Sequence, residues 1–562
     1  MNKKWEYHNV DESKVNEISE KFNIDKIVAK ILVSRGVEDE EKISIFLDPS
    51  RKDFYDPFLL NDLEIAVDRI LKAIDNKEKI AIFGDYDADG ITSTTVLKQF
   101  LDERGAIVGT YIPNRLYEGY GLNNSAIDDI KKENYNLIIT VDCGISCIDE
   151  VEHIKELGMD VIITDHHEPL DNLPKALAVV DAKRKDNTYP FNQLAGVGVV
   201  FKLIQAISIR LGLDEKEYLK YLDLVCIGTI SDIVPLIDEN RVISKLGLKL
   251  VNVTKNIGLK TLLKSSGYKE IDSTTVSFGI APRINACGRM GHQEDALELL
   301  LCNNYVRAEE LTEKLNTYNK VRQEKEKKIF EEAVIKLENE TERKNTAIVL
   351  GGEEWHHGVI GIVASKITDI YFKPAILLCF EDDIAKGSGR SIPGFDLHNA
   401  LCECSDYLEK YGGHEMAIGL TLKKDNFEKF KLKFEEYAKK SNVDEIVPII
   451  YIDGQINCKS FNIDLAKQLS ILEPFGEANR VPLFVYKNLK IDSIRTLSEG
   501  KHLKLTLKDD GNIINAIGFN LGKMSEKYRI GDKVDILGNV EINSFNGKET
   551  VQINLKDIMK SV

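Results

Sequence analysis

The chain contains no apolar run of about 18 residues or more, the length needed to cross a membrane. Its first residues, MNKKWEYHNVDESK, lack the apolar centre of a secretory signal peptide. Internal repeats and low-complexity segments are also absent from the sequence. Together these absences predict a globular, cytoplasmic protein with no membrane contact.

Paired cysteines and positive charge are scarce as well. The nine cysteines are scattered without the repeated C-x-x-C pairs of zinc sites, and we expect reduced thiols.

The formal net charge of −16 argues against a general basic coat for nucleic acid. However, residues 481–562 carry 13 Lys and Arg against 10 Asp and Glu, or +3, which leaves −19 for the rest. Any nucleic-acid path must therefore be a local groove.

A length of 562 residues predicts roughly three or four domains. Short apolar runs alternate with amphipathic stretches between residues 80 and 182, which is typical of a parallel sheet covered by helices. The predicted strands are 80–84, 107–112, 136–141, 160–164 and 176–180, and helices are expected at 91–103, 124–132 and 148–157. The fold class is therefore α/β, and function is expected at the carboxyl ends of the strands.

The other parts follow from local patterns. Residues 1–79 are expected to form an N-terminal helical segment packed on the sheet of a domain that spans 80–304, in which APRINACGRMGH (281–292) is loop-like. Residues 305–340 have no Gly or Pro and predict a long connecting helix. A second α/β domain spans 341–447. Residues 448–562, with turns at 509–511 and 546–547, predict an OB-fold-like β-barrel.

Acidic residues cluster after the predicted strands of the first sheet. The motif GDYDADG places Asp85, Asp87 and Asp89 after one strand, TVDCG places Asp142 after another, and TDHHE adds Asp165, His166 and His167. A later segment, IGTISDIVP, ends a predicted helix and could place Asp232 in the same crevice. Carboxylates this close repel one another unless a cation lies between them. Oxygen ligands with an imidazole suit Mn²⁺ or Mg²⁺, and a pair of such ions is suited to a phosphodiester.

Each of these motifs has a simpler explanation when it is taken alone. An Asp-x-Asp after a strand is often a helix cap, and a His-His pair is more often structural than metal-bound. Their joint occurrence at the strand ends of one sheet favours the metal site.

In this order, DYDADG, VDCG, DHH and SD resemble the four signature motifs of the DHH phosphoesterases. Further segments resemble the RecJ family of bacterial single-stranded-DNA-specific exonucleases within that group: GRMGH (288–292), WHHGVIGIVASK (355–366), GSGRSIPGFDLHNAL (387–401) and YGGHEMAIG (411–419). The similarity runs from about Ile80 to Gly419. It implies a DHH catalytic domain, a DHHA1 substrate-binding domain and a nucleic-acid-binding OB domain.

The resemblance also implies roles for individual residues. Two Mn²⁺ or Mg²⁺ ions would be bound by Asp87, Asp89, Asp142, His166 and Asp232, with Asp142 as the bridge. His167 would face the scissile phosphate, activating water or stabilising charge, and Asp85 would be a ligand or would orient the others. Ser388, Gly389 and Arg390 match the place that holds the 5′ end, and His414 lies in a Gly-rich turn open to a nucleotide. Arg115, Arg283 and Arg289 are candidate strand contacts, for which surface ion pairs are an equal alternative.

The function implied is a 5′-to-3′ exonuclease that releases 5′-mononucleotides from single-stranded DNA in DNA repair and recombination. Single-stranded-DNA-binding protein and a helicase are possible partners. One alternative is a DHH-family phosphodiesterase acting on short oligonucleotides or cyclic dinucleotides. Another is an inactive DNA-binding scaffold, which would be expected to have lost metal ligands.

Overall fold

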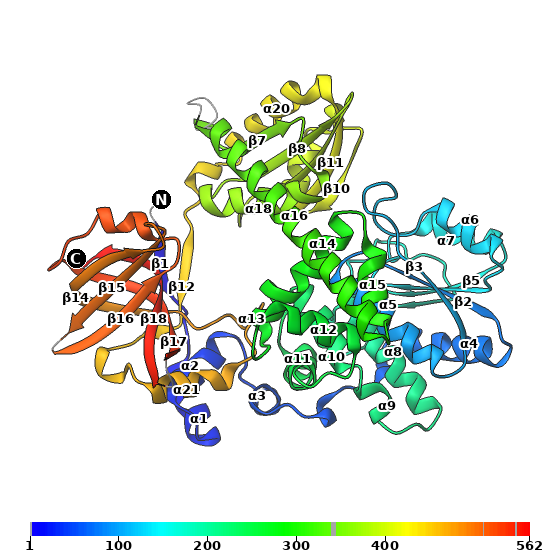
Figure 1. Ribbon diagram of the computed structural model, residues 1–562, viewed down its shortest axis with the longest axis horizontal. Coiled ribbons are helices and arrows are strands. Elements are labelled where there is room, and N and C mark those ends of the chain that lie inside the picture. Colours follow the sequence, from blue (N-terminus) through cyan, green and yellow to red (C-terminus); the bar gives the residue numbers. More distant parts are fainter. Residues whose placement is uncertain (1–2, 339–343, 510, 546–547, 562) are drawn as a thin grey trace. The chain divides into compact units, whose positions relative to one another are not determined.

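The computed structural model describes residues 3–338, 344–509, 511–545 and 548–561. By their internal contacts these residues form two compact units, which can be followed along the sequence colours of Figure 1. The larger unit comprises Asp56–Asp232 and Lys249–Pro448. The smaller unit comprises Met1–Tyr55, Ile233–Leu248 and Ile449–Val562. No helix in the described ranges is long and apolar enough to span a membrane.

The larger unit contains the five-stranded parallel sheet that the sequence predicts. In spatial order its strands are β3 (Ile107–Tyr111), β2 (Lys79–Gly84), β4 (Leu137–Val141), β5 (Asp160–Thr164) and β6 (Ala178–Val180). The chain leaves β2 for β3 on one side and returns to place β4 on the other side. A crevice outside the carboxyl ends of β2 and β4 is therefore the expected place for a ligand.

Helices cover both faces of this sheet. On one face, Ala81, Phe83 and Ile138 share a core with α6 (Asn124–Lys132) and α7 (Ile148–Glu156). The opposite face is covered by three helices: α4 (Leu63–Asp75), α5 (Ala88–Asp102) and α8 (Gly196–Arg210). The strands are nearly continuous apolar runs because both faces are buried.

Residues 281–292 are mostly helical, so the expectation of a loop is wrong. A π-helical turn, η3 (Val276–Ile280), leads into α14 (Ala281–Arg289). Pro282 lies in the first turn of α14, where its missing N–H breaks no helical hydrogen bond. Gly288 is a packing residue rather than a loop signal, because a Cβ there would lie 2.5 Å from the carbonyl oxygen of Tyr86.

The connecting helix, α16 (Tyr305–Leu337), ends in the core of the second α/β domain. The last two residues of the predicted span, 339–340, lie outside the described residues. The second domain has a mixed sheet of five strands: β10 (Lys410–His414), β11 (Ala417–Lys423), β9 (Ile384–Arg390), β8 (Ala375–Glu381) and β7 (Ile348–Gly352). Helix α18 (His357–Tyr371) packs on one face and α20 (Phe427–Lys440) on the other.

The smaller unit contains the predicted barrel. Its strands are β14 (Phe484–Leu497), β15 (His502–Asp509), β16 (Asn512–Gly518), β18 (Lys548–Lys560) and β17 (Lys533–Phe545). They pair in that order, and β17 pairs again with β14, which closes five strands into a barrel. Residues 510 and 546–547 of the two predicted turns lie outside the described residues.

The N-terminal segment does not pack on the parallel sheet as one piece, which corrects the prediction for residues 1–79. Helices α1 (Glu12–Phe22), α2 (Lys26–Ser34) and α3 (Glu40–Leu47) share an apolar core with the barrel, and only α4 packs on the sheet. Strand β1 (Lys4–Tyr7) pairs in parallel with β12 (Ile449–Ile452). Burial of the apolar faces of α1 to α3 against barrel side chains accounts for this placement.

The predicted domain 80–304 is interrupted in the same way. Residues 233–248 belong to the smaller unit, where Arg241 is fully buried. Its Nε donates to the carbonyl oxygen of Phe46 at 2.5 Å, and its Nη2 donates to that of Glu473 at 2.9 Å. One buried guanidinium therefore joins three segments that are far apart in the sequence.

A core truncation tests this organisation. Leu32 is fully buried in the core that α2 shares with the barrel. We expect Leu32→Ala to lower the free energy of unfolding of the smaller unit by about 2–5 kcal/mol. Chemical denaturation, followed by hydrogen exchange of the barrel strands, measures the loss. Ile513→Ala, at an exposed barrel position, is the control. Equal stability of the two variants would contradict a shared core.

Candidate metal centre

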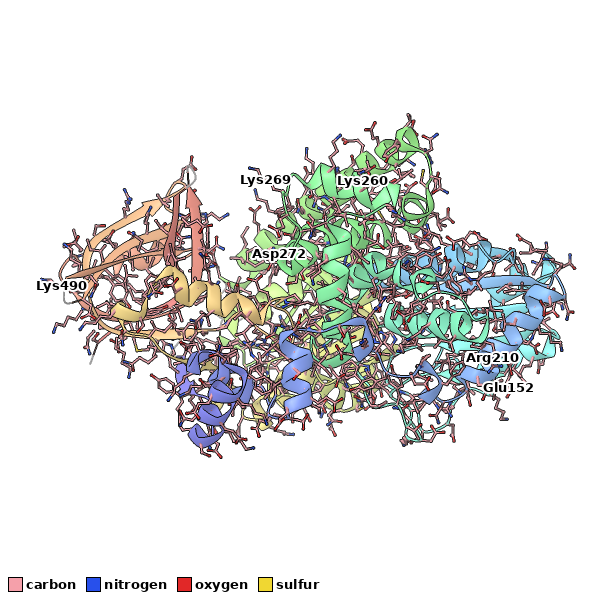
Figure 2. The ribbon with its side chains drawn as sticks, turned by 90° about the horizontal axis from the view of Figure 1, so that it is seen from below. Glu152, Arg210, Lys260, Lys269, Asp272 and Lys490 are labelled. Carbon is pink, nitrogen blue, oxygen red and sulfur yellow. The ribbon has the colours of Figure 1, made fainter. Side chains whose placement is uncertain are left out.

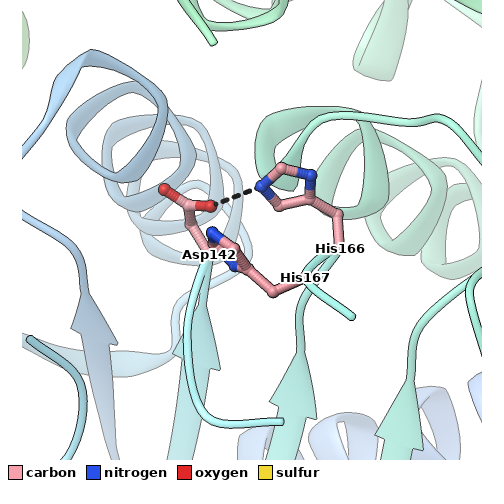
Figure 3. A group of neighbouring side chains, drawn as sticks. All are labelled: Asp142, His166 and His167. Atoms are coloured by element: carbon pink, nitrogen blue, oxygen red, sulfur yellow. Dashed lines mark ion pairs between the residues drawn. The ribbon is translucent and has the colours of Figure 1, made fainter. Parts of the chain in front are cut away.

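The carboxyl ends of β2, β4 and β5 bring the predicted acidic and histidine residues together. Asp85, Asp87 and Asp89 follow β2, Asp142 follows β4, and His166 and His167 follow β5. Figure 3 shows the imidazole of His166 directed at the carboxylate of Asp142, with Nε2 and Oδ1 3.1 Å apart. The same Nε2 lies 3.5 Å from Oδ2 of Asp232 and 3.9 Å from Oδ2 of Asp89.

Backbone N–H groups at two helix N-termini hold two of the aspartates. Asp87 is the N-cap of α5, and its Oδ1 accepts hydrogen bonds from the N–H of Asp89 and of Gly90, at 2.9 and 3.1 Å. The carboxylate of Asp89 accepts from the N–H groups of Gly196 and Val197 at the start of α8, at 2.7 and 2.8 Å. These donors fix the carboxylates and favour their negative charge.

Asp142 adopts a left-handed backbone conformation, with φ of 62°. Its close neighbour is Gly196, where a Cβ would lie 2.7 Å from the Cβ of Asp142. A side chain at position 196 would therefore displace Asp142, and the glycine allows α8 to begin directly beside the cluster.

The cluster is electrostatically strained without a cation. Burial, followed by the charge of Asp87, raises the pKa of Asp89 to about 7. Burial and neighbouring aspartates likewise raise the pKa values of Asp85, Asp142 and Asp232 well above the usual range. Burial lowers the pKa of His166 to about 3, so its imidazole is neutral. A neutral imidazole among crowded carboxylates is a suitable environment for a divalent cation.

The donor set fits hard divalent ions. Among the described residues, buried atoms without hydrogen-bond partners include Oδ1 of Asp85, Oδ1 of Asp142 and both ring nitrogens of His166. Ligand atoms within 4.8 Å of one another form three groups: Asp85, Asp87 and Asp142; Asp89, His166 and Asp232; and Asp142, His166 and His167. Asp142 is shared by the first and third groups. Carboxylate oxygens with one imidazole suit Mn²⁺ or Mg²⁺.

His167 is held by Asp165, which the sequence analysis placed in the cluster without a role, and by Tyr120, which it did not identify. Its Nδ1 lies 2.7 Å from Oδ1 of Asp165 and 3.2 Å from the hydroxyl of Tyr120, which also donates to the carbonyl oxygen of Asp142. Burial opposes protonation of His167, but the hydrogen bond and charge of Asp165 dominate and raise its pKa to about 9. The motif TDHHE pointed to Asp165, whereas no local pattern around Tyr120 distinguishes it from an ordinary exposed tyrosine.

The three predicted strand-contact arginines have no carboxylate partners among the described residues, and the charges of Arg115 and Arg289 interact with the aspartates of the cluster. Arg115 lies over the ring of Tyr86, 5.1 Å from its centroid. Arg289 donates from Nη1 to the carbonyl oxygen of Gly358 at 3.1 Å, and Arg283 donates from Nε to Oδ1 of Asn316 at 2.8 Å. The alternative of surface ion pairs is therefore not what the structure shows. Their charges remain available to an anion.

The residues predicted to hold the 5′ end lie in the second domain. Ser388, Gly389 and Arg390 end β9, and Nη1 of Arg390 donates to Oγ of Ser388 at 3.3 Å and to the carbonyl oxygen of Gly389 at 2.8 Å. Burial, followed by the charge of Arg115, lowers the pKa of Arg390. His414 ends the exposed edge strand β10 and is not among the residues bonded to Arg390. The structure therefore brings Ser388 and Arg390 together.

We expect proton release when a metal binds. Because Asp89 has a pKa of about 7 in the metal-free protein, protons compete with the cation below that pH. The affinity for Mn²⁺ should rise by about tenfold or more per pH unit between about pH 6 and pH 7, because at least one proton is displaced. Calorimetric titration in two buffers of different ionisation enthalpy measures both the affinity and the protons released. An affinity independent of pH would contradict the raised pKa values.

Three family models match separate parts of the chain. The DHH family N-terminal domain matches residues 79–229, the DHHA1 domain matches 342–440, and the RecJ OB domain matches 452–557. The matches agree with the α/β catalytic sheet, the second α/β domain and the barrel described above.

Relatives match the chain as a whole. The single-stranded-DNA-specific exonuclease RecJ of Bacillus subtilis is 41% identical over 99% of this chain and 70% of its own length. That of Salmonella typhimurium is 33% identical over 95% of each chain. The crystal structure of RecJ from Thermus thermophilus in complex with Mn²⁺ has a TM-score of 0.87 at 31% identity, covering 100% of this chain and 80% of that one. A Mg²⁺ complex of the same protein has a TM-score of 0.80 at 29% identity, covering 100% and 79%. With an acidic cluster suited to the same ions, matches to all three family models and similarity along the whole chain, the chain belongs to the RecJ family.

Proposed function

We propose that this protein is a metal-dependent exonuclease that degrades single-stranded DNA from the 5′ end and releases 5′-mononucleotides. The observation that carries the proposal is the cluster of carboxylates and an imidazole at the carboxyl ends of β2, β4 and β5, several of whose buried atoms have no hydrogen-bond partner among the described residues. The RecJ relatives are named for single-stranded DNA, and crystal structures of the family contain Mn²⁺ or Mg²⁺.

Each residue of the cluster has a defined task in this proposal. Two ions, when bound, supply Lewis acidity at the scissile phosphate and lower the pKa of a water nucleophile. Asp87, Asp89, Asp142, His166 and Asp232 hold them, with Asp142 shared between groups. Asp85 lies in the first group with a partner-free oxygen, which favours a ligand role over a purely orienting one.

His167 acts on the substrate rather than on the metals. Since Asp165 and Tyr120 occupy its Nδ1, its Nε2 is the nitrogen left for a phosphate oxygen. A pKa of about 9 makes the metal-free side chain a cation at neutral pH. This favours stabilisation of phosphate charge over activation of water as its role.

The alternatives receive less support. A phosphodiesterase for cyclic dinucleotides or short oligonucleotides needs only the two α/β domains, and the closed barrel adds a binding surface beyond that need. An inactive scaffold would be expected to lack metal ligands, whereas all five are present. Binding to single-stranded-DNA-binding protein or a helicase, a role in DNA repair and recombination, and a cytoplasmic location remain predictions from the sequence.

Removal of the shared carboxylate tests the metal centre. Asp142→Asn keeps the size of the side chain but loses its charge, and we expect hydrolysis to fall by about 100-fold or more because both ions lose a ligand. The thermal midpoint of the metal-free variant should not fall, since carboxylate repulsion is relieved. Release of nucleotides from end-labelled single-stranded DNA with Mn²⁺ measures the rate. Retention of most of the activity would remove Asp142 from the bridging position.

The same assay with substrates of different kinds tests the class of activity. Single-stranded DNA labelled at either end, duplex DNA and dinucleotides are incubated with Mn²⁺. Consumption of the single strand with early loss of a 5′ label supports the proposal. Preferential consumption of dinucleotides would favour the phosphodiesterase.

Arg390 tests the direction of degradation. If it grips a terminal phosphate, Arg390→Ala should weaken binding of a 5′-phosphorylated strand by about 10- to 100-fold, with a much smaller loss for a 5′-hydroxyl strand. Arg390→Lys should restore part of the affinity, since the charge is kept but the planar fork is lost. Apparent KM values on both substrates measure the preference. An identical loss on both ends would exclude Arg390 from 5′-phosphate recognition.

The barrel is proposed to bind single-stranded DNA through exposed aromatic rings. Among the aromatic candidates for stacking, Phe484 and Tyr486 are fully buried in the core, whereas Phe519 is 51% exposed. The side chain of Phe545 lies outside the described residues. Because residues 1–55 share the barrel core, deletion of 448–562 alone would expose their apolar faces. Phe519→Ala in the full chain is the cleaner test of stacking.

A further inference from the structure

A second cationic surface lies in the larger unit, on a segment that no part of the metal centre uses. Residues 249–280 contain five lysines and two acidic residues, in a chain whose net charge is −16. Four of the lysines are exposed around α12 (Ile257–Ser266) and the loop that follows it: Lys255, Lys260, Lys264 and Lys269. Figure 2 labels Lys260 and Lys269 on this part of the chain, with Asp272 nearby.

These lysines have no carboxylate partner among the residues the structure describes. In α12 the apolar side chains Leu259, Leu262 and Leu263 are buried, whereas Lys260 and Lys264 lie one turn apart on the exposed face. Of the two acidic residues, Asp272 is already engaged, since its Oδ1 accepts from the N–H and hydroxyl of Thr275. The other, Glu270, is exposed and cannot neutralise four cations.

Exposed aromatic rings accompany the lysines. Phe278, in the π-helical turn η3, is 79% exposed, and Tyr268 is 51% exposed. The ring of Tyr268 lies against the backbone of Gly279, where a Cβ would come within 2.8 Å of it. A shallow pocket of about 260 Å³ is lined by Tyr268 together with Lys260, Lys264 and Lys269. Two rings and several unpaired cations on one surface provide stacking for bases and attraction for phosphates.

A chain of contacts links this surface to the metal centre. Asn316 on α16 accepts from Arg283 and donates from Nδ2 to Oγ of Ser265 at the end of α12, at 3.4 Å. Helix α14 then runs from η3 to the cluster, where Oδ1 of Asn285 accepts from the N–H of Ala88 at 2.7 Å. Helix α14 thereby connects the turn that carries Phe278 to the N-terminus of α5, which follows Asp87 directly.

We propose that Lys255, Lys260, Lys264 and Lys269, with Tyr268 and Phe278, form a second binding site for single-stranded DNA, distant from the reacting phosphate. We call it the α12 surface. The lysines bind phosphates, and the two rings stack on unpaired bases. The surface holds a part of the strand that has not yet been cut, so that substrate stays bound between successive cuts. The proposal rests on the exonuclease function proposed above.

The test compares long and short strands in two variants with matched controls. The lysine variant is K260Q/K264Q/K269Q, and its control, K72Q/K155Q/K175Q, removes three positive charges from exposed positions elsewhere in the larger unit. The ring variant is Y268A/F278A, and its control is Y305A/Y117A, which removes two other exposed rings. Circular dichroism and thermal midpoints verify that each variant is folded.

Binding is measured by fluorescence anisotropy in EDTA, with thymidylate oligonucleotides of about 30 and about 4 nucleotides. We expect the lysine variant to bind the long strand about tenfold or more weakly, with a salt slope reduced by about two, since each lost phosphate contact reduces the slope by roughly 0.7. The ring variant should bind the long strand about fivefold or more weakly than the wild type. Binding of the short strand should not change in either variant.

Three outcomes would overturn the α12 surface. One is a loss of affinity for the long strand no larger than that of the controls, which would mean that these lysines and rings do not bind single-stranded DNA. Another is an equal loss on long and short strands. The third is an equal loss on duplex and single-stranded DNA, because stacking on the rings needs unpaired bases. Hydrolysis of the short strand with Mn²⁺ in the wild type reports separately on the proposed function, so the two failures are distinguishable.

Discussion

The mutual repulsion of buried carboxylates is the constraint on which the catalytic unit depends. The carboxyl ends of parallel strands lie at the same edge of a sheet, so the aspartates that follow the adjacent strands β2 and β4 lie close together. The fold opposes that repulsion with backbone N–H groups at the starts of α5 and α8, which donate to Asp87 and Asp89. These donors do not neutralise Asp142, whose Oδ1 has no hydrogen-bond partner among the described residues. The remaining negative potential gives the site its affinity for divalent cations.

Close packing around the cluster follows from the same constraint. α8 reaches Asp89 only because Gly196 leaves no side chain between the helix and Asp142. α10 (Leu222–Ser231) approaches from another side, and a Cβ at Gly228 would lie 3.0 Å from Oδ1 of Asp89. Asp232 directly follows this helix, so the packing of α10 sets the position of the last carboxylate. The metal centre is thus assembled by helices that lie far apart in the sequence.

The sequence predicted the catalytic sheet and its acidic edge because both leave local signals. Runs such as NLIITV have the apolar continuity of strands buried on both faces, and each is followed by its charged motif. It did not predict that residues 1–55 join the barrel, since the apolar stripes of α1 to α3 do not specify a partner. Nor did it predict α14, because Pro282 and Gly288 resemble loop signals when the packing of Tyr86 is unknown. The sequence also contained no sign of the role of Tyr120, because its hydroxyl contacts His167 only in the folded chain.

Charge distribution reconciles an acidic protein with a polyanionic substrate. A net charge of −16 repels DNA, but at ordinary ionic strength salt screens this repulsion at distances beyond about 10 Å. At shorter range, the decisive feature is which cations lack a carboxylate partner. Most arginines on the outside of the sheet are paired, as Arg69 is with Glu78 and Asp160. Arg115 and Arg390 have no such ion pair among the described residues, and Arg115 lies close enough for its charge to help lower the pKa of Arg390, after burial. A strand is thereby attracted to the few places where positive charge is not already neutralised, and the acidic remainder of the surface disfavours binding elsewhere.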